Sequence, residues 1–255
     1  MKRLVIKVGT AVLTQDGELA YERMKNLVKL IATLKNEKNI DVILVSSGAV
    51  GAGYTSLKLD KSILANKQTL AAIGQPKLMK TYQEMFEEFG ITVAQMLFIA
   101  DDFDSRKRSK NAKNVMEILL KNKVLPIINE NDVISTEELI GDNDQLAAYV
   151  THYFKADMLS ILTDIDGYYN KNPREFNDAE ILKVVNVISE EELNKQPTAN
   201  SKFATGGIVT KLKAADFLMK KGIPMYLSSG FDLTNAYDFL VEGNHKSGTV
   251  FQSIK

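Results

Sequence analysis

VLPIINENDVISTEELIGDNDQLAAYV, residues 124–150, is the stretch that decides the fold of this chain. It opens with the apolar run 124–128, whose length and composition predict a buried strand. The polar residues 129–132 follow, as expected where a strand of a parallel sheet ends. Two aspartates within 142–144 then precede the segment 145–150, and this pattern predicts a helix with acidic residues in its first turn.

Two clusters of Asn and Asp, at 129–132 and 141–144, therefore flank a predicted loop. In an open α/β sheet, ligands bind in the crevice beyond the carboxyl ends of the strands. Polar clusters at that edge are well suited to hold a small polar ligand. Asn and Asp are also common turn and cap residues, so this stretch alone leaves a binding role and a structural role equally open.

Strands and helices are predicted to alternate along the whole chain. The strand patterns lie at 3–8, 41–45, 91–99, 124–128, 157–162, 182–187, 224–227 and 249–251. The helical patterns lie at 21–38, 62–89, 101–121, 145–150, 209–221 and 233–241, and the GQP tripeptide at 74–76 is expected to interrupt the second. This alternation predicts an α/β fold with a mostly parallel sheet and helices on both faces.

Composition narrows the classes of function. The 255 residues are 45% hydrophobic, enough to bury a sizeable core. Lys plus Arg and Asp plus Glu both number 32, and this balance argues against a protein that binds nucleic acid through bulk charge. The basic residues of 106–113 are read as a solvated helix face. The absence of Cys excludes disulfides, thiolate catalysis and Cys-ligated metals.

Targeting signals are not apparent in the sequence. The apolar run at the N-terminus, residues 4–6, is too short for the core of a signal peptide. No segment approaches the roughly 20 apolar residues of a membrane span. We therefore expect a cytoplasmic protein that does not bind membranes.

A first glycine-rich segment, SSGAVGAG at 46–53, follows the predicted strand 41–45. A strand, a glycine turn and a helix start in this order form a cradle for anions. The spacing is not that of a Rossmann fingerprint, and Tyr54 replaces the lysine of a Walker A loop. Two readings stay open: a backbone nest with the Ser47 hydroxyl, suited to a carboxylate or phosphate, and glycines kept for tight packing.

A second glycine-rich segment, TGGIVTK at 205–211, leads into the amphipathic helix predicted at 209–221. Lys211 falls in the first turn of that helix, where the helix dipole disfavours a cation unless an anion is nearby. Backbone N–H groups, the dipole and a lysine together suit a polyphosphate. Residues 205–211 are therefore predicted to bind phosphate groups rather than to serve only as a turn.

The two histidines, His152 and His245, lie outside every motif, so a Ser–His nucleophile and a two-histidine metal site are unsupported. Phosphoryl transfer to a carboxylate needs no general base, because a carboxyl group with a pKa of about 4.3 is already ionised at neutral pH. That chemistry needs positioning, Mg²⁺ and cations. Lys7, at the end of the first predicted strand, and Lys211 are candidates for the cations.

Six motifs occur in the order KVGTAVLT, VSSGAVGAG, INENDVI, GDNDQLAA, LTDIDGYY and TGGIVTKLKAA. This set, spread over residues 2–251, resembles the amino-acid kinase family and, within it, the members that phosphorylate glutamate. The resemblance implies a three-layer αβα sandwich with a mostly parallel central sheet. It further implies one kinase domain over 1–255, with an acceptor (glutamate) lobe at 1–155 and a nucleotide lobe at 156–255.

The activity implied by the resemblance is ATP-dependent phosphorylation of the L-glutamate side chain to L-glutamyl 5-phosphate, the first step of proline biosynthesis, with Mg²⁺ as cofactor. The alternatives are an acetylglutamate or aspartate kinase and a catalytically silent amino-acid sensor on the same fold. The pair Lys7 and Lys211 disfavours the sensor, which has no phosphoryl charge to stabilise. The aspartates Asp132, Asp142 and Asp144 suit an acceptor that carries an ammonium group.

The resemblance also implies roles for individual residues. Glutamate would be bound by Ser47, Gly48, Asp132 and Asn143. ATP would be bound by Lys7, Thr163, Asp164, Thr205, Gly206, Gly207, Ile208, Val209, Thr210 and Lys211. Lys7 and Lys211 would stabilise the transferring phosphoryl group and Asp144 would orient them, while no residue is assigned to a metal site.

One departure from the family concerns the end of the chain. Many bacterial members carry a C-terminal RNA-binding-like domain, and the sequence predicts a form that lacks it. The resemblance further implies a homo-oligomer, either a dimer or a tetramer, and allows a contact with the next enzyme of the proline pathway.

Overall fold

The computed structural model describes residues 1–135, 143–173, 175–194 and 207–254. In those ranges, none of the helices combines the length and the apolar composition that a membrane crossing requires.

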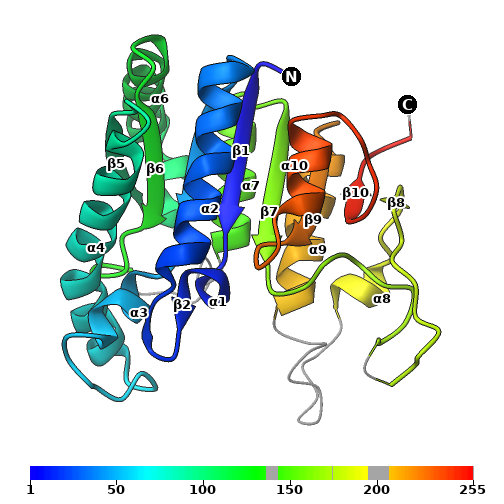
Figure 1. The fold of residues 1–255 in the computed structure, drawn as a ribbon, viewed down its shortest axis with the longest axis horizontal. Coiled ribbons are helices and arrows are strands. Elements are labelled where there is room, and N and C mark those ends of the chain that lie inside the picture. Colours follow the sequence, from blue (N-terminus) through cyan, green and yellow to red (C-terminus); the bar gives the residue numbers. More distant parts are fainter. Residues whose placement is uncertain (136–142, 174, 195–206, 255) are drawn as a thin grey trace.

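An eight-stranded sheet runs through the centre of the molecule, in the order β5-β6-β4-β1-β7-β9-β10-β8 (Figure 1). Its strands are β1 (Arg3–Val8), β4 (Asp41–Ser46), β5 (Val93–Phe98), β6 (Leu125–Glu130), β7 (Met158–Thr163), β8 (Val184–Val185), β9 (Met225–Ser229) and β10 (Thr249–Phe251). Strand β10 is antiparallel to β9, and the other neighbours pair in parallel. The mostly parallel sheet predicted from the sequence is thus confirmed.

Helices cover both faces of this sheet. They are α1 (Thr10–Leu13), α2 (Tyr21–Ala32), α3 (Ala49–Tyr54), α4 (Leu64–Glu87), α5 (Ala100–Asp104), α6 (Arg106–Lys121), α7 (Asn143–Tyr153), α8 (Glu190–Leu193), α9 (Gly207–Met219) and α10 (Thr234–Leu240). A π-helical turn, Thr33–Glu37, follows α2, and a small hairpin of β2 (Thr14–Gln15) and β3 (Glu18–Leu19) follows α1.

The sheet separates two apolar cores. Alternate side chains of β1 point to opposite faces, as the two-residue period of a strand requires. Leu4 and Ile6 pack with residues of α2, α4 and α10 in one core. Val5 packs with residues of α6, α7 and α9 in the other. The result is the three-layer αβα sandwich predicted above.

Helix α4 continues through Pro76, so the predicted interruption at 74–76 is wrong. The reason is packing against α3. A Cβ atom added to Gly74 would lie 1.8 Å from the carbonyl oxygen of Ala49, and one added to Gly53 would lie 1.9 Å from that of Leu70. The two helices therefore touch backbone to backbone, and this contact, with Leu78 buried beyond it, holds α4 straight across the proline.

Three other predicted elements differ from the structure. The helix predicted at 101–121 is divided at Ser105, whose backbone is extended and whose hydroxyl oxygen accepts a hydrogen bond from the Arg108 amide to begin α6. The helix predicted at 21–38 ends as an α-helix at Ala32 and continues as the π-helical turn. The strand predicted at 182–187 is reduced to Val184–Val185, because only these residues pair with β10.

The close contact between α3 and α4 generates a prediction about stability. Gly74→Ala should lower the free energy of unfolding by at least about 2 kcal/mol, because the new methyl group overlaps backbone atoms that cannot move separately. In a helix without this contact, the same change would raise stability by about 0.5–1 kcal/mol. Urea denaturation measures the difference, and a variant as stable as the parent would contradict the close approach. The control is Ala72→Gly, at an exposed position of α4, which should cost about 1 kcal/mol through helix propensity alone.

Candidate active site

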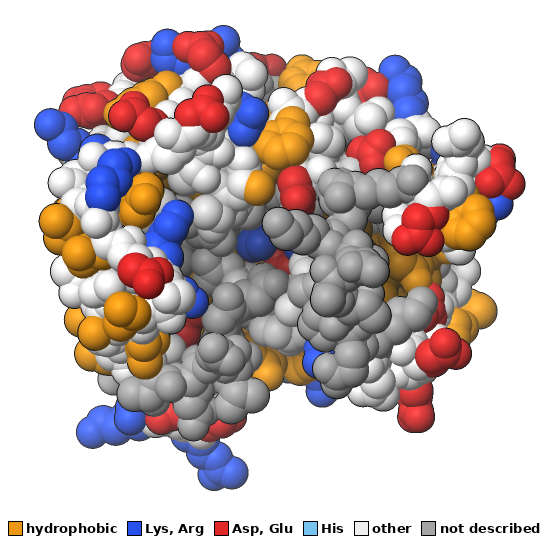
Figure 2. All heavy atoms as spheres, turned by 90° about the horizontal axis from the view of Figure 1, so that it is seen from below, with side chains coloured by type: hydrophobic (Ala, Val, Ile, Leu, Met, Phe, Trp, Pro, Cys, Tyr) orange, Lys and Arg blue, Asp and Glu red, His pale blue; other side chains and the backbone are white. Residues whose placement is uncertain are grey.

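A cavity of about 690 Å³ opens at the carboxyl edge of the parallel strands. Seen from below in Figure 2, this face of the molecule is hollowed, with charged side chains in the hollow. The lining residues come from the ends of β1, β4, β6 and β7 and from the starts of α7 and α9. This is the crevice where ligands bind in open α/β sheets.

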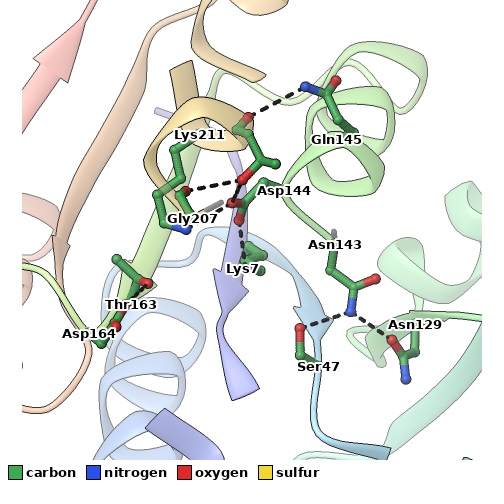
Figure 3. Close-up of polar contacts among 11 residues, drawn as sticks. Lys7, Ser47, Asn129, Asn143, Asp144, Gln145, Thr163, Asp164, Gly207 and Lys211 are labelled. Carbon is green, nitrogen blue, oxygen red and sulfur yellow. Dashed lines mark hydrogen bonds and ion pairs between the residues drawn. The ribbon is translucent and has the colours of Figure 1, made fainter. Parts of the chain in front are cut away.

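Two lysines and one aspartate form a buried ion cluster in this cavity (Figure 3). The Nζ atom of Lys7 lies 2.6 Å from Oδ1 of Asp144, and that of Lys211 lies 3.0 Å from Oδ2. Lys211 also donates a hydrogen bond to the carbonyl oxygen of Gly207, and Thr210 donates one to Asp144. The exposed fractions of Lys7, Asp144 and Lys211 are 4%, 0% and 5%, so the cluster is almost dry.

The electrostatics of the cluster follow from its burial. Burial alone would raise the pKa of Asp144, but the attraction of Lys7 and then of Lys211 is stronger and holds that pKa well below its ordinary value. Asp144 is therefore ionised at neutral pH. Among the described residues, the two lysines share this one carboxylate, and their positive charges favour the binding of an anion in the cavity.

Secondary structure brings the three charges together. Lys7 lies on the same face of β1 as Val5, which is the face covered by α7 and α9. Asp144 and Lys211 lie in the first turns of those helices. The anion that the sequence required near Lys211 is thus supplied, at least in part, by the protein itself.

A network of uncharged polar side chains lies in the neighbouring part of the cavity. Nδ2 of Asn143 donates hydrogen bonds to Oγ of Ser47, at 2.8 Å, and to Oδ1 of Asn129, at 2.9 Å. Gly48 follows Ser47 with a φ of 101°, a left-handed conformation that favours glycine. Ser47, Gly48 and Asn143, predicted from separate motifs, therefore lie in one site.

Asp132 lines the same cavity and is half-buried. Burial, reinforced by the negative charge of Glu130, raises the pKa of Asp132 to about 6, against a smaller opposing effect of Lys67. An ammonium group bound beside Asp132 would lower that pKa again, and binding of such a group would release a proton near pH 6.

A second cavity, of about 650 Å³, adjoins the first at Asp164, which lines both. Its walls combine the loop after β7, including Gly167 and Tyr168, with Ile208 and Val209 of α9. The Thr163 hydroxyl donates a hydrogen bond to Asp164 at the boundary of the two cavities.

Gly9 borders the space beside Lys7. A Cβ atom at Gly9 would lie 3.7 Å from Oγ1 of Thr163 and 3.8 Å from Nζ of Lys7, so the glycine keeps open the space next to both polar atoms. An open, positively charged space that leads into a partly apolar cavity fits a nucleotide with its phosphates at the lysines.

Comparisons with known proteins agree with this geometry. The model of the amino acid kinase family matches residues 2–229. The glutamate 5-kinase of Wolinella succinogenes is 57% identical over 98% of this chain and 98% of its own length. That of Leishmania donovani is 52% identical over 99% of this chain and 96% of its own length. The chain belongs to the amino acid kinase family.

Solved structures of two other kinases show the same fold. The carbamate kinase of Giardia lamblia bound to AMP-PNP superposes with a TM-score of 0.69, at 16% identity, over 99% of each chain. The isopentenyl phosphate kinase of T. acidophilum gives a TM-score of 0.66, at 15% identity, over 98% of this chain and 99% of its own.

The glutamate 5-kinase of Caldanaerobacter subterraneus is longer than this chain, and the 44% identical match covers 68% of that relative.

The positions of the predicted site residues in this kinase can now be stated. Lys7, Ser47, Gly48, Asp132, Asn143, Thr163, Asp164 and Lys211 all line the first cavity. Gly207, Ile208, Val209 and Thr210 form the first turn of α9, whereas Thr205, Gly206 and Asp142 lie outside the described residues.

One reading of the sequence is wrong and two residues were missed. Asp144 cannot be a partner for a substrate ammonium group, because both of its oxygens contact lysines. Asn129 was noted only as part of a polar cluster, and Gln75 only as part of a helix break, yet both belong to the hydrogen-bond network around Asn143. Asn129 directly follows the apolar run 124–128, and that position at the end of a strand could have predicted its place in the site. Nothing in the local sequence around Gln75 predicted its role.

The ion cluster generates the prediction for Lys211. Lys211→Ala should lower kcat by at least about 100-fold, the scale for losing one preorganised charge next to a reacting group. The matched control is Lys213→Ala, two residues along the same helix but exposed, which should leave kcat within about twofold. Steady-state kinetics measure kcat for both variants, and thermal melts verify that they are folded. Equal kcat values for the two variants would mean that Lys211 only maintains the structure.

Proposed function

We propose that this kinase transfers the γ-phosphoryl group of ATP to the side-chain carboxylate of L-glutamate. The product is L-glutamyl 5-phosphate, and the reaction is the first step of proline biosynthesis. The observation that carries the proposal is the buried Lys7–Asp144–Lys211 cluster, whose two lysines line the first cavity, next to an adjoining second cavity. The relatives named glutamate 5-kinase, 57% and 52% identical over nearly the whole chain, support glutamate as the acceptor.

The acceptor lobe, residues 1–155, would hold glutamate by its charged ends. Asp132, which lines the first cavity, would bind the α-ammonium group, whereas Asp144 is engaged by lysines. Ser47 receives a hydrogen bond from Asn143 and keeps its own hydroxyl hydrogen to donate to a carboxylate. Gly48 allows the backbone beside Ser47 to approach the substrate closely.

Phosphoryl transfer in this site requires no general base. The acceptor carboxylate attacks the γ-phosphorus, a new O–P bond forms, and the bond from that phosphorus to the β-γ bridging oxygen breaks, releasing ADP. Charge spreads over the oxygens of the transferring group. Lys7 and Lys211 would stabilise that charge, and Asp144 would hold their Nζ atoms in place without a reorganisation during the reaction.

The nucleotide lobe, residues 156–255, would place ATP in the second cavity, with its phosphates beside Gly9 and the first turn of α9. Mg²⁺ bound to the phosphates would neutralise part of their charge. Within the ranges that the structure describes, no group of three or more acidic or histidine side chains could hold a metal ion alone. This fits Mg²⁺, which kinases hold mainly through phosphates with one or two carboxylates, and Asp164 is the carboxylate between the cavities.

The alternative acceptors fit less well. N-acetylglutamate carries no charged amine, so it gives the half-buried Asp132 no partner. A silent sensor would gain nothing from two lysines buried with one carboxylate. Location in the cytoplasm, assembly as a dimer or tetramer and contact with the next enzyme of the proline pathway stay predictions.

The direct test is ADP release by the purified protein with Mg²⁺, ATP and one acceptor at a time. L-glutamate should support turnover, while aspartate and N-acetylglutamate should have at least about 100-fold lower kcat/KM, because each leaves a buried polar group unpaired. Trapping with hydroxylamine, which converts an acyl phosphate to a hydroxamate, verifies that the carboxylate is the group modified. Turnover of aspartate or N-acetylglutamate equal to that of glutamate would refute the proposal.

The raised pKa of Asp132 generates a prediction about pH. As the pH falls through about 6, Asp132 takes up a proton and loses its attraction for the ammonium group, so the KM for glutamate should rise below pH 6. Asp132→Asn should raise that KM at neutral pH by about 10- to 150-fold, corresponding to 1.5–3 kcal/mol for a hydrogen bond to a charged group.

The variant should also lose this pH dependence, because asparagine does not titrate. The control is Asp104→Asn, an exposed acid on α5, which should keep the parent profile. The KM for ATP should stay within about twofold in both variants, and calorimetric titration should accompany the kinetics. A normal affinity for glutamate combined with a weak affinity for ATP in Asp132→Asn would reverse the assignment of the lobes.

A further inference from the structure

A chain of side-chain amides connects the acceptor site to the surface of the molecule. Asn143 donates to Oδ1 of Asn129, at 2.9 Å. Asn129 donates to Oε1 of Gln75, at 3.0 Å, and Gln75 donates to Oε1 of Gln95, at 3.1 Å. The chain links α7, β6, α4 and β5, and Gln75 itself does not line the cavity.

The hydrogen bonds in this chain all run in the same direction. Each amide donates from its NH₂ group to the next residue nearer the surface, and the oxygen of Asn129, Gln75 and Gln95 accepts from the residue nearer the cavity. An amide can rotate by 180° and exchange its donor and acceptor sides at little cost unless its neighbours fix it. Gln75 fixes Asn129 by presenting an acceptor, and Asn129 then presents an acceptor to Asn143. The orientation of Asn143 is therefore determined by a residue outside the cavity.

The consequence appears at the inner end of the chain. Both hydrogens of the Asn143 NH₂ group are used, on Asn129 and on Ser47. Its Oδ1 atom is buried and has no hydrogen-bond partner among the described residues. A buried acceptor without a partner costs about 1–3 kcal/mol, and a ligand that brings a donor would remove that cost.

We propose that Gln75 is a positioning residue for substrate recognition: it sets the polarity of the Gln75–Asn129–Asn143 chain so that Asn143 offers an acceptor to the ammonium group of the substrate. The same polarity makes Ser47 a recipient of the Asn143 hydrogen bond and leaves the Ser47 hydroxyl hydrogen for a substrate carboxylate. The site thus presents an acceptor and a donor in fixed places. This inference rests on the proposed function, since it concerns how glutamate is recognised.

The reverse polarity would give the opposite recognition. If all three amides rotated, Asn143 would accept from Asn129 and Ser47 and would turn its NH₂ group toward the ligand. An ammonium group would then meet donors at Asn143, and discrimination in favour of an amine would be weaker, with Asp132 as its remaining source. Specificity for an amino acid over a plain dicarboxylate is therefore the property that depends on Gln75.

The test compares glutamate with glutarate, which has the same two carboxylates and no amine. Gln75→Met removes the acceptor for Asn129 while keeping the volume of the side chain. Its KM for glutamate should rise by about 5- to 30-fold, the scale of one buried hydrogen bond at tenfold per 1.4 kcal/mol. The ratio of kcat/KM for glutamate to that for glutarate should fall by a similar factor, and the KM for ATP should stay within about twofold.

Two further variants separate polarity from simple loosening. Gln75→Glu keeps an acceptor that cannot rotate into a donor, so its KM for glutamate and its glutamate-to-glutarate ratio should stay within about threefold of the parent. Gln95→Met removes the acceptor for the Gln75 NH₂ group at an exposed position of β5, where water can take its place, and should change both values less than Gln75→Met does. Thermal melts without ligand verify that all variants are folded.

The outcomes distinguish this inference from the proposed function. A parent protein that neither phosphorylates nor binds glutamate overturns both. If the parent phosphorylates glutamate but Gln75→Met has an unchanged KM for it, only the role of Gln75 is overturned. An equal loss for glutamate and glutarate in Gln75→Met would show that Gln75 supports the fold of the site and does not set its polarity.

Discussion

The structure depends on the buried contact of Lys7 and Lys211 with Asp144. Removing three charged groups from water is strongly unfavourable, and the close approach of opposite charges offsets that cost. Strand β1 and helices α7 and α9 can therefore pack together only when all three side chains meet. The same requirement holds two preorganised lysines in the wall of the first cavity, where a phosphoryl group would be transferred.

A second constraint is the close packing of α3 on α4, which depends on Gly53 and Gly74. It fixes the turn at Ser47 and Gly48 against α4, and it places Gln75 next to Asn129. The two roles considered for the glycines of residues 46–53, ligand binding and tight packing, are thus compatible. Gly53 serves packing, whereas Gly48 provides the left-handed turn that lines the cavity.

The ion cluster and the helix contact shape different parts of the site. Charge is concentrated where phosphoryl transfer would occur, and neutral amides surround the place proposed for the amino acid. Neutral amides can be arranged as donors or acceptors without the desolvation cost of ions, so they suit the recognition of a substrate that carries both signs of charge. Asp132 is the exception, and its raised pKa reflects how little the unliganded site compensates its charge.

The sequence by itself determined the α/β class and the mostly parallel sheet, because apolar runs, glycine turns and polar strand ends are local patterns. It also named eight of the residues that line the cavity. It also placed Lys211 at a helix start that requires an anion. The family resemblance named Asp144 as the partner of this lysine, but only the tertiary structure brings the two together, since they lie 67 residues apart in the chain. The tertiary structure also decided that α4 continues through Pro76 and that Gln75 contacts Asn129, 54 residues away. Contacts between distant segments are formed by packing, and no local pattern in the sequence records them.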